Sequence, residues 1–121
     1  MRLFSMTVLF GVIIGQVQAE PCFDMYQQSN FERAVEPGLI IPATEEVPEH
    51  CVVRGVVNRS IEFELRMPTT GWNGRFLMMG TGGSSGYIAP TDTELHRGFA
   101  TSSTNTGLYD VSAYGTDIAV V

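Results

Sequence analysis

The sequence predicts an α/β fold, in which an antiparallel hairpin is followed by one βαβ unit. The hairpin is predicted by an unbroken apolar–polar alternation over residues 61–67, because alternate side chains of a half-buried strand face opposite sides. The βαβ unit is predicted by an apolar run, a glycine-rich loop, a short helix signal and a second strand, in that order.

The start of the chain has the pattern of a secretory signal peptide. Arg2 supplies the positive charge, residues 3–14 form the apolar stretch, and Val17-Gln18-Ala19 is a small-residue cleavage site. The apolar stretch is only about twelve residues long, which is short for a membrane span. We therefore expect residues 1–19 to be removed and the mature, secreted domain to occupy residues 20–121.

Two cysteines, Cys22 and Cys51, are the only ones in the sequence. An oxidising compartment favours a disulfide between them, and the loop it closes would be worth roughly 3–4 kcal/mol. Two free thiols are the alternative. With two cysteines and two histidines at scattered spacing, no metal site is expected.

Residues 20–50 read as an irregular arm, with one short helix within residues 23–35 and an exposed, proline-punctuated connector after it. The hairpin follows, with strands at residues 51–57 and 61–67, a turn at 58–60, and Pro68 as its end.

The βαβ unit begins at residues 75–79, a continuous apolar run that is typical of a strand buried on both faces. A glycine-rich loop at residues 80–86 comes next. A capping box at residues 91–94 predicts a short helix that Gly98 ends, and residues 99–103 form the second strand.

The formal net charge of −6 comes from thirteen acidic residues against seven arginines, with no lysine. An acidic surface repels phosphate groups, so we expect no nucleic-acid partner and no docking to an anionic membrane.

The glycine-rich loop contains a G-x-S-x-G pattern, which offers Ser84 as a nucleophile followed by Asp92 and His96. Three features argue against this triad. Pro90 interrupts the helix that must follow a nucleophile elbow, Asp92 and His96 would lie one turn apart on one helix, and the chain is short for a hydrolase sheet.

Glycine-rich loops after a strand also occur in nucleotide-binding sites and in oxyanion holes. A phosphate-binding loop needs a lysine, which the chain lacks, and a dinucleotide fingerprint needs glycine where Ser85 stands. Backbone N–H groups pointing into a cleft would instead suit an oxyanion hole. A tight turn without chemistry is the alternative.

Five segments follow one another in a recognisable order: residues 51–55, 61–68, 72–77, 80–83 and 97–107. The most specific is Trp-Asn-Gly-Arg-Phe-Leu at residues 72–77, followed by the glycine loop. Together these segments resemble the tannase and feruloyl esterase family of secreted serine hydrolases, and an early cysteine like Cys22 paired with one like Cys51 also fits that family.

The resemblance implies an α/β-hydrolase fold with an inserted lid, and hydrolysis of phenolic-acid esters such as gallates or ferulates. By resemblance, Gly82 or Gly83 offers an oxyanion-hole N–H and Ser84 is only a neighbour. The family's catalytic serine, acid and histidine, and its calcium-binding lid, lie in later regions. We therefore expect an incomplete hydrolase sheet, no cofactor in this chain, and no activity by this chain alone.

One position departs from the family pattern, since Leu108 stands where a histidine usually follows the Asn-Thr-Gly segment. His50 and His96 match no catalytic position and are expected at the surface. Asn58 lies in a glycosylation sequon, which would be used in a eukaryote.

An alternative function from another class is a small secreted β-rich module. Such a module would bind polysaccharide or phenolics through Trp72 and Tyr87.

Overall fold

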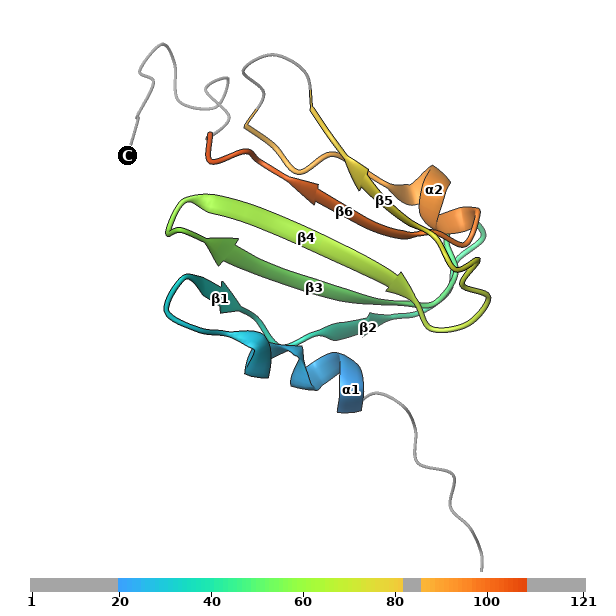
Figure 1. Cartoon of the computed structure of the whole chain (residues 1–121). Helices are drawn as coiled ribbons and strands as arrows, with labels where there is room; N and C mark the ends of the chain where they lie inside the picture. Colours follow the sequence, from blue (N-terminus) through green and yellow to red (C-terminus); the bar gives the residue numbers. More distant parts are fainter. Residues whose placement is uncertain (1–19, 82–85, 109–121) are drawn as a thin grey trace, which may run out of the picture.

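The computed structural model describes residues 20–81 and 86–108, which form one mixed sheet (Figure 1). Its strand order is β1-β3-β4-β6-β5, and β2 also pairs with β3. This sheet agrees with the predicted α/β class. The elements are α1 (Glu20–Phe23), a 3₁₀ helix η1 (Asp24–Gln28), β1 (Arg33–Val35), β2 (Leu39–Ile41), β3 (His50–Val57), β4 (Ile61–Pro68), β5 (Phe76–Met79), α2 (Asp92–His96) and β6 (Ala100–Thr104).

The predicted hairpin is confirmed as the antiparallel pair β3–β4, in which Val57 lies opposite Ile61. Its turn places Asn58 and Arg59 at φ values of 50° and 70°. Positive φ at two successive turn residues matches the twist of the two strands. Pro68 is the last residue of β4, opposite His50, rather than the residue after the strand.

The predicted βαβ unit is confirmed as well, because β5 and β6 are parallel neighbours and α2 lies between them in sequence. Gly98 follows α2 with φ at 87°, and its N–H donates to the carbonyl oxygen of Leu95. The predicted capping box is wrong in one respect. The Thr91 side chain makes no cap hydrogen bond, because its hydroxyl lies 2.8 Å from the hydroxyl of Thr101 instead.

The N-terminal arm is more regular than the sequence predicts. The expected helix is present only as α1 and η1, and residues 33–35 form a strand instead. Both short strands pair with β3, β1 along its second half and β2 along its first. Three-residue strands carry too little alternation to be recognised locally, so they form because β3 offers an otherwise open edge.

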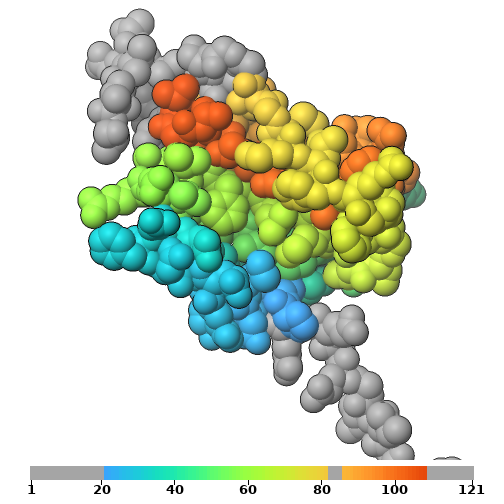
Figure 2. All heavy atoms as spheres, viewed as in Figure 1, coloured from blue at the N-terminus to red at the C-terminus, as the bar shows by residue number. Residues whose placement is uncertain are grey.

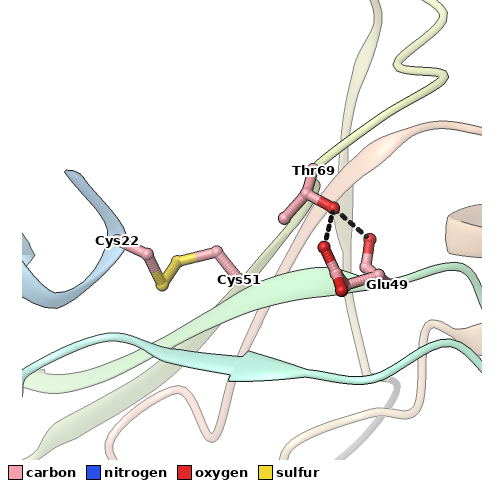
Figure 3. The surroundings of a disulfide bond; sticks show 4 residues. All are labelled: Cys22, Glu49, Cys51 and Thr69. Atoms are coloured by element: carbon pink, nitrogen blue, oxygen red, sulfur yellow. Dashed lines mark hydrogen bonds between the residues drawn. A yellow bond between two sulfur atoms is a disulfide. The ribbon is translucent and has the colours of Figure 1, made fainter. Parts of the chain in front are cut away.

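The arm is fixed to the sheet by the predicted disulfide between Cys22 and Cys51 (Figure 3). Both cysteines are buried, and they form the core with Val53. Gly38 is required at this contact, because a Cβ atom there would lie 2.1 Å from the carbonyl oxygen of Cys22. Partly buried apolar residues complete the cluster: Met25, Val35, Ile40, Leu65 and Met67.

Hydrogen bonds between Thr69 and Glu49 join the two chain segments at the open end of the β3–β4 hairpin, next to the disulfide. The Thr69 hydroxyl lies 2.8 Å from the Glu49 carboxylate and 3.2 Å from the Glu49 carbonyl oxygen, as Figure 3 shows. The backbone N–H of Thr69 donates to that carbonyl as well. These contacts fix the position of the first residue after β4.

The sheet has two distinct faces. We call the side that carries Cys51, Val53 and Leu65 the disulfide face, and the side that carries Arg66, Thr101 and Ser103 the helix face. Contacts of Arg66 with Asp92, and of Thr101 with Thr91, place α2 and the segment before it over the helix face.

The prediction that the first βαβ strand is buried on both faces is wrong. In β5, Phe76 and Met78 on the disulfide face are 58% and 59% exposed, whereas Leu77 and Met79 on the helix face are partly buried. The disulfide-face core is centred on β3 and β4 and does not reach β5. Figure 2 shows β5 (yellow) at the surface.

Candidate functional site

The carboxyl ends of the two parallel strands define the candidate site. Because β5 and β6 run in the same direction, the glycine loop after Met79 and the turn after Thr104 leave the sheet at one edge. Ligands of open α/β sheets bind outside this edge. The predicted residues Gly82, Gly83 and Ser84 lie outside the described residues.

The turn after β6 is tightly built around Asn105, which is 1% exposed. Its side-chain oxygen accepts hydrogen bonds from the backbone N–H groups of Glu62 at 2.9 Å and Gly107 at 3.0 Å. Thr106 has a φ of 58° and Gly107 a φ of 78°. Positive φ is unfavourable for a β-branched residue, so the Asn105 contacts hold Thr106 in a strained conformation, as occurs at functional sites.

The segment that returns from the glycine loop is attached to β6. We call residues 86–91 the return limb. The Ser103 hydroxyl donates to the carbonyl oxygen of Ala89 at 2.9 Å, and the Thr101 and Thr91 hydroxyls lie 2.8 Å apart. Both contacts are buried. The downstream end of the glycine loop is therefore tied to the strand that borders the candidate site.

Asp92 and His96, the other members of the disfavoured triad, are engaged elsewhere. Asp92 forms an ion pair with Arg66, and His96 is exposed, as expected, with its Nδ1 atom 2.9 Å from the Glu46 carbonyl oxygen. Glu46 and α2 border an open depression of about 410 Å³. These contacts give no support to an acid–base pair serving Ser84.

His50 corrects the expectation of a surface residue, because it is fully buried. It opens β3, where Ile41 of β2 lies on one side and Pro68 of β4 on the other. Its Nδ1 atom lies 2.7 Å from the Pro48 carbonyl oxygen, which satisfies one ring nitrogen. Its Nε2 atom is buried with no hydrogen-bond partner among the described residues.

The residues of the alternative binding module are accessible. Trp72 is 59% exposed and Tyr87 is 48% exposed. The indole N–H of Trp72 donates to the Arg75 carbonyl oxygen at 2.9 Å, so the ring has a fixed orientation. Asn58, the predicted sequon asparagine, is exposed in the hairpin turn.

Within residues 20–81 and 86–108, no group of three or more acidic, histidine or cysteine residues is arranged to hold a metal ion. In that same part of the chain, no helix is long and apolar enough to cross a membrane.

The polar row of β6, formed by Thr101 and Ser103, was not predicted from the sequence. These two residues lie at alternate positions and share one face of the strand, and Asn105 follows with the same spacing directly after the strand. All three are buried, although their composition suggests an exposed face. The available signal was the pair of small polar residues, Thr101 and Ser103, at alternate positions of a strand predicted to lie inside a βαβ unit.

Comparison with known proteins gives two findings. Residues 46–118 match the family model described as tannase and feruloyl esterase. The chain is also similar to a mono(2-hydroxyethyl) terephthalate hydrolase from Piscinibacter sakaiensis, with 36% identity over 87 residues. That alignment covers 54% of this chain and 14% of the hydrolase. The chain thus matches only a small part of the length of this relative.

Proposed function

This chain belongs to the tannase and feruloyl esterase family, and we propose that it forms the front part of a secreted carboxylic ester hydrolase acting on phenolic-acid esters. The observation that carries the proposal is the parallel β5–β6 pair, which sends the glycine loop and the Asn105 turn to one edge of the sheet. Oxyanion-stabilising loops of α/β hydrolases follow a strand in this way.

The role proposed for the glycine loop is stabilisation of negative charge. When a serine attacks an ester carbonyl, the oxygen becomes an oxyanion, and preorganised N–H donors lower the barrier by a few kcal/mol each. Gly82 or Gly83 supplies one such N–H, and Ser84 is a neighbour. The nucleophile, its base and its acid belong to later parts of the longer protein.

An aromatic ester substrate is supported by the relative, whose name describes hydrolysis of a terephthalate monoester. Secretion is supported by the signal-peptide pattern of residues 1–19 and by the disulfide, which an oxidising compartment favours. We further propose that residues 20–121 alone hydrolyse no ester.

The first experiment reads the transcript downstream of the Val121 codon. We expect an open reading frame that continues into a segment with a serine flanked by cysteine and glycine. A stop codon directly after Val121 in the mature message would mean that the chain shares ancestry with the family but is not the front part of a hydrolase. The proposal would then be refuted.

The second experiment assays the purified mature chain, residues 20–121, on a chromogenic ferulate ester. We expect no hydrolysis above the buffer rate. Measurable hydrolysis that Ser84→Ala abolishes would restore Ser84 as the nucleophile and overturn the proposed role of the loop.

A second candidate function, a binding module, is favoured by one observation: the exposed Trp72 ring is held in place by its own N–H. Fixed, exposed aromatic rings present binding area at low entropic cost. Titration of the mature chain with ferulic acid and with a soluble xylan, followed by tryptophan fluorescence, tests it. Saturable binding lost in Trp72→Ala would support the module, whereas no spectral change would remove it.

A further inference from the structure

The polar row of β6 lies where a buried strand normally carries apolar side chains. Thr101 is fully buried and Ser103 is 2% exposed, and β6 lies between β4 and β5. Burying a hydroxyl is unfavourable unless it forms a hydrogen bond. The identity of the partners therefore indicates what these two residues do.

Both partners belong to the return limb. The Ser103 hydroxyl donates to the carbonyl oxygen of Ala89, and the Thr101 hydroxyl pairs with that of Thr91. Ala89 is 8% exposed and Thr91 is 2% exposed, so water does not compete freely for these bonds. The two contacts hold the limb at two points along the helix face.

We propose that Thr101 and Ser103 are positioning residues for the glycine loop, because they fix its return limb against β6. The catalytic part of this inference rests on the proposed function, whereas the attachment itself does not. The loop leaves the sheet at the end of β5, whose register with β6 is fixed by pairing. The Thr101 and Ser103 hydroxyls fix the other end of the loop, because they hold the return limb against β6.

The physical need for a second fixed point comes from the composition of the loop. Residues 80–86 contain four glycines, and glycine loses more backbone freedom on ordering than any other residue. Oxyanion stabilisation requires donors held within about 0.5 Å of the productive geometry. An apolar residue at position 103 would leave the Ala89 carbonyl buried without its hydrogen-bond partner, which is unfavourable.

The test compares Ser103→Ala with Ser102→Ala in the full mature chain. Ser102 is the neighbouring serine on the opposite face and is only partly buried, so it controls for the loss of a hydroxyl. The measurement is the NMR order parameter of the backbone N–H groups of Tyr87, Ile88 and Ala89. We expect values of about 0.85 in the wild type and in Ser102→Ala, and below about 0.6 in Ser103→Ala.

A second measurement covers the case in which Ser103→Ala folds poorly. Thr101→Val keeps the side-chain shape and removes the other contact, and chymotrypsin cleavage after the exposed Tyr87 reports opening of the limb. We expect cleavage at least about tenfold faster than in Ser102→Ala, the change that corresponds to losing one buried hydrogen bond. Unchanged order parameters and unchanged cleavage in both variants would overturn the attachment.

The catalytic part has a separate readout in the longer product. Ser103→Ala should lower kcat about 10- to 100-fold with little change in KM, the effect of a slightly misplaced catalytic group, and Ser102→Ala should not. A loosened limb with unchanged kcat would overturn the positioning role. A loosened limb in a protein that hydrolyses no ester would instead refute the proposed function and leave the attachment intact.

Discussion

The buried hydroxyl pair Thr91–Thr101 makes a quantitative prediction about stability. Thr101 is fully buried and Thr91 is 2% exposed, with the two oxygens 2.8 Å apart. Thr101→Val keeps the volume but leaves the Thr91 hydroxyl buried without this partner, so we expect the free energy of unfolding to fall by about 1–3 kcal/mol. Replacing both threonines by valine removes both polar groups together and should restore most of this loss.

The assay is urea unfolding of the mature chain and of the two single variants and the double variant, which together form a double-mutant cycle. Thr93→Val, at an exposed position of α2, is the control and should change stability by less than about 0.5 kcal/mol. If the effects of Thr91→Val and Thr101→Val simply add, the two hydroxyls do not depend on each other and the reasoning is wrong.

Three further perturbations have defined outcomes. Replacing Cys22 and Cys51 by serine should lower the free energy of unfolding by roughly 3–4 kcal/mol in denaturant titrations, and an unchanged midpoint would show that the arm is held without the disulfide. Gly98→Ala should lower the melting temperature, because φ is 87° and a Cβ atom there would lie 2.8 Å from the Gly71 carbonyl oxygen; a melting temperature equal to that of the wild type would contradict this geometry. Met78→Lys should raise the concentration at which the mature chain stays monodisperse in light scattering, because it interrupts the exposed apolar face of β5; lower solubility would mean that this face is already covered.

The strands of the hairpin and the βαβ unit could be predicted because their signals are local. The alternation at residues 61–67 sets the faces of β4, and the capping residues together with Gly98 bound α2 within about one residue. The parallel pairing of β5 and β6 then follows from the handedness and length of a βαβ connection.

The features that could not be predicted depend on distant partners. β1 and β2 exist because β3 pairs with them, and His50 is buried because strands lie on both sides of it. The roles of Ser103 and Asn105 depend on Ala89 and Glu62, which are 14 and 43 residues away in sequence. A composition of small polar residues does not reveal such partners.

The measurement that tests the central claim most directly compares kcat of Gly82→Pro, Gly83→Pro and Ser84→Ala in the proposed longer product, on a ferulate ester and on mono(2-hydroxyethyl) terephthalate. Proline removes the backbone N–H, so one of the two glycine variants should lose roughly 10²–10³-fold in kcat. Ser84→Ala should stay within about tenfold of the wild type, because a neighbour of the oxyanion hole takes no part in the chemistry. Full activity in both proline variants, or complete loss of activity in Ser84→Ala, would contradict the account.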